Sequence, residues 1–506
     1  MFSQSKPFAP ILPGIEHVVV LMFENRSFDN VLGGLYPDKS PTEYDGLIGN
    51  EANPVYPACP HNTEQIKVWQ GATDPATTIM PYPDPGELFK DMNEQIFGGC
   101  PETEPANMKG FVSNYLRQDS SPDGCAPDAR QIMQYFAPGP GGNIPVTSAL
   151  AQAYAVSDQW FASGPVQTLA NRIFAHCAMP GKYQDDNGDW HAVINNTDIT
   201  SHDLEALGFV TQPPIFEQLD EAGQSWKVYY HDWPLSTFVK YVLDRWRLVE
   251  GPVRPFKSHL LEDRFFPDFF YDVQHGLPAY SFIEPAYTDL LGGIPNSNHP
   301  GGSTINEEPP PISICNGENL LNSVYTALYN GPNNLFEKTL LIVTYDEHGG
   351  LYDHVPPRGA VSPFLTSENI RGFAYTRYGV RVPAIFINPY IQPGTVFRPP
   401  AVSPPFDHTS IISTLRAQFP NLAGPLTPRD QAAPTLAGLI DTSKPLNKLD
   451  PATLLTLECQ AVQKPCAGST AGVKGPKPHS IAAVIKQAAE SRPDKLAIAR
   501  AHRGLI

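Results

Sequence analysis

Positive charge is scarce in this chain, and long apolar runs are absent. The 506 residues carry 35 Lys and Arg against 52 Asp and Glu, a formal net charge of −17 at pH 7. We expect no nucleic-acid partner, because polyanions bind basic surfaces. No run of 18 apolar residues occurs, so we expect no transmembrane segment. An acidic protein can still act on an anionic substrate where a metal ion reverses the local field.

Signals for export and for structural zinc are missing too. Residues 1–13 do not place a charged region before an apolar core, so we expect no signal peptide. Seven cysteines leave an odd one, and no spacing among them matches a zinc site. The sequence therefore predicts a cytoplasmic protein or one exported by a leaderless route. It leaves the disulfide state and the oligomeric state open.

The apolar segments indicate an α/β fold. Five short apolar runs end in polar residues, at 18–23, 226–230, 279–283, 339–345 and 382–387. Helical patterns lie between them, at 144–155, 169–178, 317–330 and 410–417. Strands that alternate with helices predict a mainly parallel central sheet with helices on both faces. The 55 prolines and 39 glycines predict long ordered loops around it.

The chain divides into a main domain and a C-terminal extension. We expect one catalytic domain over residues 1–447, with a loop-rich insertion at about 36–140 that covers the site. Residues 448–506 form the extension, with a short helical piece at 451–462, a linker and a helical tail at 480–506. The tail has an alanine-rich face that either docks on the body or serves a partner. Its members are Ala482, Ala483, Ala488 and Ala489.

Polar side chains follow two of the predicted strands directly. Glu24 and Asn25 come after the strand at 18–23, and Asp346 and Glu347 come after the strand at 339–345. In open α/β sheets, sites form beyond the carboxyl ends of the strands. Two strands that end in hard oxygen ligands indicate a metal-assisted hydrolase.

Thr168 lies where a helix is predicted to begin. Gly164 and Pro165 set a tight turn before it, and the helical pattern starts at Leu169. Free N–H groups and the helix dipole stabilise an anion at such a position. A hydroxyl there becomes a better nucleophile where a metal also binds it. The alternative is that Thr168 only caps the helix.

Three motifs in order carry a resemblance to a known family. They are Glu24-Asn-Arg-Ser-Phe-Asp29, Gly164-Pro-x-x-Thr168-x-x-Asn171-Arg172, and Asp346-Glu-His-Gly-Gly350 followed by Tyr352-Asp353-His354. The chain resembles the phosphoesterase family that holds bacterial non-haemolytic phospholipases C and acid phosphatase A. The resemblance implies an alkaline-phosphatase-like fold, a divalent metal ion and a phosphothreonine intermediate. By it Thr168 is both nucleophile and metal ligand, and the other ligands are Glu24, Asn25, Asp346 and Glu347.

Further residues are candidates for the catalytic and substrate contacts. Two histidines are predicted to contact the phosphoryl oxygens or the leaving group. They are His299, in a His-Pro segment that matches the family, and His354. Either could donate a proton near neutral pH. Asn171 and His231 are weaker candidates for binding substrate.

One position departs from the family pattern. The better-known members carry histidine in an Asp-Pro-Gly-His segment, whereas this chain reads Asp84-Pro-Gly-Glu87. A carboxylate there repels a phosphate dianion unless it is protonated, bound to metal or paired with a cationic headgroup. Glu87 is therefore a further candidate for substrate binding, and it favours a diester that bears an amine such as choline.

The sequence leaves three functions to compare. Threonine at position 168 resembles the phospholipase C branch of the family, so we predict a phosphodiesterase whose substrate is a phosphate ester, with a phospholipid as one candidate. An acid phosphatase-like phosphomonoesterase is the first alternative. A non-catalytic relative that binds a phosphorylated ligand is the second, and it would bind metal or phosphate without releasing product.

Overall fold

The protein is described by a computed structural model. The structure describes residues 9–56, 64–71, 75–103, 105–121, 124–200, 207–246, 253–254, 267–291, 293–301, 312–454, 459, 480–494 and 496. None of the helices in this part of the chain is long and apolar enough to cross a membrane.

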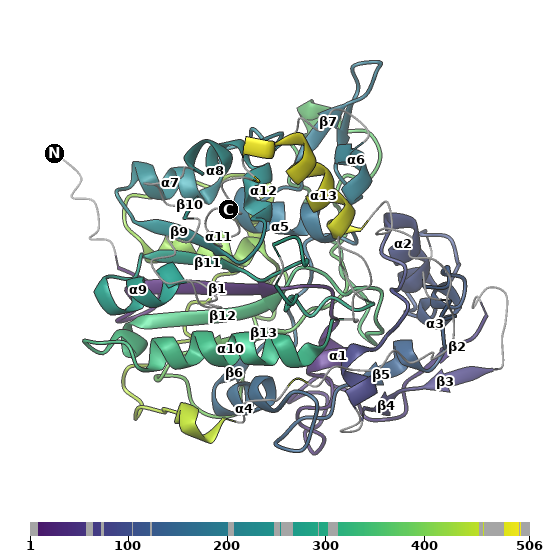
Figure 1. The fold of residues 1–506 in the computed structure, drawn as a ribbon, viewed down its shortest axis with the longest axis horizontal. Helices are drawn as coiled ribbons and strands as arrows, with labels where there is room; N and C mark the ends of the chain where they lie inside the picture. Colours follow the sequence, from purple (N-terminus) through teal and green to yellow (C-terminus); the bar gives the residue numbers. More distant parts are fainter. Residues whose placement is uncertain are drawn as a thin grey trace.

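One central sheet runs through the described structure (Figure 1). Within the described residues its strand order is β10-β9-β11-β1-β12-β13-β6-β14. Neighbours from β10 to β12 are parallel, as are β6 and β14, while β13 is antiparallel to both β12 and β6. The strands span Val253–Arg254 (β10), Trp226–Tyr230 (β9), Tyr280–Glu284 (β11), His17–Phe23 (β1), Thr339–Tyr345 (β12), Ala384–Ile387 (β13), Ala155–Val156 (β6) and Thr395–Val396 (β14).

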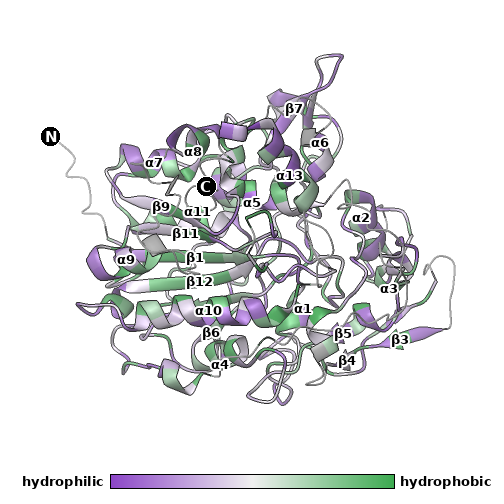
Figure 2. Ribbon diagram, viewed as in Figure 1, coloured by the Kyte–Doolittle hydropathy of each residue, from purple (hydrophilic) through white to green (hydrophobic). Residues whose placement is uncertain are grey.

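The middle of the sheet is covered on both faces. All seven residues of β12 are buried, and successive side chains of a strand point to opposite faces. Figure 2 shows β1 and β12 as apolar strands at the centre of the molecule. Two packed groups of helices supply the cover. One holds α4 (Pro145–Ala153), α9 (Pro267–His275) and α10 (Ile314–Tyr329); the other holds α5 (Thr168–Cys177), α7 (Ile215–Glu221), α11 (Thr409–Gln418) and α12 (Pro428–Ala432).

This arrangement confirms the predicted α/β class with a mainly parallel sheet. The predicted strands at 226–230 and 339–345 coincide with β9 and β12, and the four predicted helices correspond to α4, α5, α10 and α11. The strand predicted from residue 382 begins only at Ala384. Three strands of the sheet, β6, β10 and β14, were not predicted, because a two-residue strand leaves no period in the sequence.

The insertion at 36–140 builds a second apolar cluster beside the site end of the sheet. Leu351 and Tyr352, from the loop after β12, are buried in that cluster with side chains of the insertion. The insertion therefore packs on the loop that follows Asp346 and Glu347. Its elements are β2 (Ala52–Pro54), β3 (Gln65–Lys67), β4 (Trp69–Gln70), η1 (Pro75–Ile79), α2 (Phe89–Phe97), α3 (Phe111–Tyr115), η2 (Gln131–Met133) and β5 (Gln134–Tyr135).

Short elements complete the main domain. They are α1 (Phe28–Val31), β7 (Lys182–Gln184), β8 (Trp190–Ala192), α6 (Asn196–Thr200), η3 (Leu235–Phe238), α8 (Lys240–Arg245), η4 (Leu335–Lys338) and η5 (Thr366–Glu368).

The C-terminal extension returns to the body of the protein. Helix α13 (Ile481–Ser491) begins at the N-cap Ser480 and packs near α6. Ala482, Ala488 and Ala489 of the predicted alanine-rich face are buried. The helical piece predicted at 451–462 is a single turn, η6 (Pro451–Thr453), in its described part. The predicted linker and residues 497–506 of the predicted tail lie outside the described residues.

A disulfide ties the extension to α10. Cys315, in the first turn of α10, is bonded to Cys459. Cys100 and Cys125 are also in disulfides, and Cys177 is a buried free thiol.

Candidate active site

The turns after β1 and β12 lie side by side. Phe23 pairs with Tyr345 at the ends of the two parallel strands, so Glu24 and Asp346 are neighbours. The N–H of Asn25 donates to Asp346 Oδ1 at 3.0 Å. Asn25 has φ +57°, a left-handed conformation that asparagine tolerates. Gly349 is needed for this approach, because a Cβ at that position would lie 2.1 Å from the carbonyl oxygen of Asn25.

Thr168 reaches this pair of turns from α5. It is the first residue of the helix, and the N-cap is Gln167. The capping role considered from the sequence is therefore wrong. The Thr168 hydroxyl donates to Asn25 Oδ1 at 3.2 Å. The structure thus brings the predicted nucleophile to the predicted ligand Asn25, at a helix end that favours negative charge.

Two glutamates of the site have oxygens without a partner. Glu24 and Glu347 are fully buried, and no hydrogen bond within the described structure reaches either carboxylate oxygen of Glu24 or Oε1 of Glu347. Burial raises the pKa of Glu24 to about 8, with His299 and Arg172 opposing the rise and Asp346 adding to it. Burial, followed by the charges of Glu87 and Asp346, raises the pKa of Glu347 well above its usual range. Buried carboxylate oxygens of this kind fit a cation.

Asp346 differs from the two glutamates because its carboxylate oxygens already accept several hydrogen bonds. Oδ1 accepts from the N–H groups of Asn25 and Glu347, and Oδ2 accepts from Arg172 Nε at 3.0 Å. A carboxylate offers about four acceptor positions, so one remains for a ligand. Arg172 was not predicted as a site residue from the sequence. Its spacing from Thr168, one helical turn along α5, places both on one helix face and was the available signal.

Glu87 enters the site from the insertion. Its Oε1 accepts from Asn25 Nδ2 at 2.7 Å and lies 3.5 Å from Nε2 of His299. Both Glu87 and His299 are buried. The position at which this chain departs from the family pattern is therefore in contact with a predicted metal ligand and with a predicted catalytic histidine.

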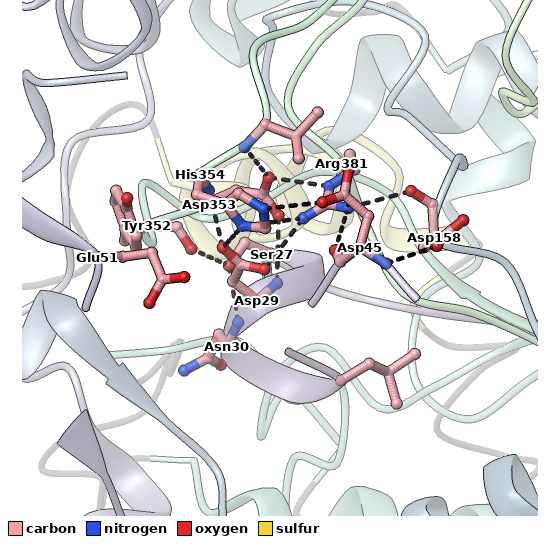
Figure 3. A network of polar contacts seen from close by, with 12 residues as sticks. Ser27, Asp29, Asn30, Asp45, Glu51, Asp158, Tyr352, Asp353, His354 and Arg381 are labelled. Carbon is pink, nitrogen blue, oxygen red and sulfur yellow. Dashed lines mark hydrogen bonds and ion pairs between the residues drawn. The ribbon is translucent and has the colours of Figure 1, made fainter. Parts of the chain in front are cut away.

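His354 lies in a separate network of charged side chains (Figure 3). Its Nδ1 is 2.7 Å from Asp29 Oδ2, and its Nε2 is 3.2 Å from Asp45 Oδ1. Arg381 bonds to Asp29 and to Asp353 in the same network. Burial alone would lower the pKa of His354, but the charge of Asp29 and hydrogen bonds to Asp29 and Asp45 raise it to about 10. Both ring nitrogens thus face these carboxylates, and His354 makes no hydrogen bond to Thr168 within the described residues, so its catalytic role stays a prediction.

The two weaker candidates also lie apart from the unpartnered carboxylates. The Asn171 side chain bonds to Gly164 N and O and to Val166 O, so it holds the turn that precedes Thr168. His231 follows β9, and β11 separates β9 from β1. Neighbouring strands are about 4.8 Å apart, so the two spacings between β9 and β1 place His231 about 10 Å across the sheet from the end of β1. Substrate contact by either residue stays a prediction.

Known proteins resemble this chain over most of its length. The profile of the Phosphoesterase family matches residues 15–421. Non-specific phospholipase C3 of Arabidopsis thaliana is 34% identical over 457 residues, which cover 85% of this chain and 74% of that protein. Phospholipase C A of Mycobacterium tuberculosis is 28% identical over 430 residues, covering 81% of this chain and 73% of that protein.

Similarity to solved structures is weaker. A protein of the alkaline phosphatase superfamily from Vibrio parahaemolyticus superposes with a TM-score of 0.32 and 13% identity, covering 60% of this chain and 64% of that chain. At that TM-score the superposition adds nothing to what the strand order already shows. The sequence matches carry the assignment, and they confirm the resemblance recognised from the motifs. The chain belongs to the phosphoesterase family and is a phosphoric ester hydrolase.

Proposed function

We propose that the protein is a metal-dependent phosphodiesterase of phospholipase C type that uses Thr168 as its nucleophile. The observation that carries the proposal is the position of the Thr168 hydroxyl. It lies 3.2 Å from Asn25 Oδ1, at the start of α5. The next residue to Asn25 is Glu24, whose two carboxylate oxygens are buried and lack a hydrogen-bond partner in the described structure.

The donor set fits a divalent cation. Glu24, Asn25, Asp346 and Glu347 offer carboxylate and amide oxygens, and Thr168 offers its hydroxyl. Oxygen donors of this kind suit hard or borderline cations. When bound, such an ion lowers the pKa of the hydroxyl and polarises the phosphoryl group.

The residues of the chain supply orientation and charge stabilisation. Asn25 holds the Thr168 hydroxyl, and the N-terminus of α5 stabilises the negative charge that develops on the attacked phosphoryl group. Thr168 Oγ1 forms a bond to phosphorus as the bond to the leaving alcohol breaks. The resulting threonyl phosphoester keeps the second ester group of a diester, and water then releases the headgroup phosphate. His299, next to Glu87, is assigned to the leaving-group side.

A diester is favoured over a monoester by the charge of Glu87. A monoester carries a dianion near neutral pH, and a buried carboxylate repels two charges more strongly than the single charge of a diester. The relatives are named phospholipases C, which supports a phospholipid-type substrate. The phosphomonoesterase is the second candidate, because the nucleophile and the oxygen ligands serve either reaction.

The proposal is tested by comparing p-nitrophenyl phosphate with p-nitrophenylphosphorylcholine. We expect the diester to be cleaved by the wild type and by Thr442→Ala, which changes an exposed threonine. Thr168→Ala should lose on the order of 10³- to 10⁶-fold in kcat. Chelator should abolish turnover, and added divalent metal should restore it.

Other outcomes would change the assignment. Cleavage of the monoester alone would make the protein a phosphatase. Binding of phosphate without turnover of either ester, across several added metals, would support the non-catalytic relative. Retained activity in Thr168→Ala would exclude this nucleophile.

A further inference from the structure

Three potential metal ligands gather next to the proposed metal site. Ligand atoms of Asp84, Glu87 and His299 all lie within 4.8 Å of one another. The side chains of Glu87 and His299 are 5% and 2% exposed, and that of Asp84 is 12% exposed. Asp84 and Glu87 precede α2 in the insertion, whereas His299 belongs to the loop after β11. The grouping is therefore created by the insertion folding onto the sheet.

The ring of His299 is oriented as a metal-binding histidine usually is. Its Nδ1 is 2.6 Å from the carbonyl oxygen of Pro300, so Nδ1 carries the proton and donates it. Nε2 is then the ring nitrogen that can bind a cation, and it lies 3.5 Å from Glu87 Oε1, while Asp84 Oδ1 lies 3.9 Å from Nδ1. Histidines that bind metals commonly donate their other ring N–H to a backbone carbonyl in this way.

The group is continuous with the turn after β1. The N–H of Glu24 donates to the carbonyl oxygen of Ser297, two residues before His299. Asn25 Nδ2 donates to Glu87 Oε1. Both carboxylate oxygens of Glu24 are buried without a hydrogen-bond partner in the described structure. The turn that carries Glu24 and Asn25 therefore adjoins this group of ligands.

The balance of charge favours two cations over one. Five carboxylates meet here: Glu24, Asp84, Glu87, Asp346 and Glu347. Two guanidinium groups face them, Arg172 beside Asp346 and Arg26 near Asp84. With the carboxylates ionised, three negative charges remain. One divalent cation leaves a net charge of −1, which repels a phosphate ester. Two leave +1, which matches the single negative charge of a phosphodiester.

We propose that Asp84, Glu87 and His299 bind a second divalent cation beside the first. The inference rests on the proposed function and deepens it, because it assigns His299 to a cation instead of to proton donation. A donor set of two carboxylates and one imidazole suits Zn²⁺, Mn²⁺ or Co²⁺ better than Mg²⁺ or Ca²⁺. Paired cations in two-metal sites bind the attacking and leaving oxygens of a phosphoryl transfer.

The test is the metal content of the full chain, measured without reference to activity. Protein stripped with chelator is loaded with Mn²⁺ or Co²⁺, dialysed and analysed for bound metal per chain. We expect two ions in the wild type, one in Glu87→Gln and one in Asp84→Asn. Glu102→Gln makes the same chemical change at an exposed position of the insertion and should keep two. The Co²⁺ spectrum of the wild type should lose its imidazole-ligand contribution in His299→Ala.

Each alternative outcome overturns the proposal in a recognisable way. One ion in the wild type, retained in Glu87→Gln, would exclude the second cation and leave His299 in contact with Asp84 and Glu87 only. If Glu87→Gln also lost cleavage of the choline ester but of no other ester, Glu87 would be assigned to binding the cationic headgroup. No bound metal in the wild type would overturn the first site as well, and with it the metal dependence of the proposed function. The wild-type stoichiometry decides even where a variant fails to fold.

Discussion

Arg172 holds the carboxylate of Asp346 at the point where three elements meet. Its Nε donates to Asp346 Oδ2 at 3.0 Å, and its Nη2 donates to the carbonyl oxygens of Met22 and Phe23. One buried guanidinium therefore joins α5 to the ends of β1 and β12. Because Thr168 lies one turn before Arg172 on α5, the same contact fixes the nucleophile relative to the oxygen ligands.

Removing this guanidinium should reduce both stability and metal affinity. We expect Arg172→Met to lower the free energy of unfolding by about 3–5 kcal/mol, because it leaves Asp346 buried without its ion pair. Urea unfolding and metal titration measure the two effects. Arg371→Met breaks an ion pair with Asp189 whose arginine is 58% exposed, and it should cost less than about 1 kcal/mol. Equal losses in the two variants would contradict the account.

The His354 network should make stability depend on pH above neutrality. The pKa of His354 is raised to about 10 in the folded protein, above its usual value of 6.5. The protonated ring therefore stabilises the fold fully below about pH 6.5, and this contribution is lost as the pH rises towards 10. Unfolding free energies of the wild type should fall from pH 6.5 to 9.5 more steeply than those of His354→Gln. Asp45→Asn should give an intermediate slope, and equal slopes would show that His354 is not charged.

The bond between Cys315 and Cys459 should stabilise the protein substantially. It closes a loop with a sequence separation of 144 residues, for which chain entropy gives roughly 3–5 kcal/mol. The double variant Cys315→Ser/Cys459→Ser should melt at a lower temperature under non-reducing conditions. Cys177→Ala, at the buried free thiol, leaves the bond intact and should change the melting temperature less. A non-reducing peptide map that pairs Cys459 with another cysteine would contradict the pairing.

Helix α13 should protect the surface on which it docks. Its buried side chains include Ile481, Val484 and Ile485. Ile485→Ala removes buried apolar volume, at a cost of about 2–5 kcal/mol. We expect faster hydrogen exchange within residues 480–491 for this variant. Gln487→Ala changes an exposed position of the same helix and should exchange as the wild type does. An unchanged rate in Ile485→Ala would indicate that the helix is not docked in solution.

The sequence was most informative where a single segment carries the signal. The apolar runs of β1 and β12 predict buried strands, and sites form beyond the carboxyl ends of such strands. The observed pairing of Phe23 with Tyr345 then places Glu24 next to Asp346. The Gly-Pro turn predicted the helix that begins at Thr168. These inferences need only the local period and the topology that it implies.

Contacts between distant segments could not be predicted in the same way. His354 and Asp29 are 325 residues apart, and the motif that contains His354 does not reveal which way its ring points. Asp29 and Asp45 hold the ring, and the segments that carry them meet the loop of His354 only in the folded chain. Glu87 was recognised as a departure from the family pattern, but its contact with Asn25 depends on how the insertion packs.

The most direct test of the threonine nucleophile is to trap the intermediate on Thr168. Wild-type protein turning over p-nitrophenylphosphorylcholine is quenched in acid and digested, and the peptide that contains Thr168 is analysed by mass spectrometry. With a threonine nucleophile, a fraction of this peptide should carry one phosphorylcholine group on Thr168, and Thr168→Ser should carry it on the serine. The contrary result is steady turnover with neither a modified peptide nor a burst of nitrophenol. It would show that water attacks the ester directly, and it would contradict the threonine nucleophile.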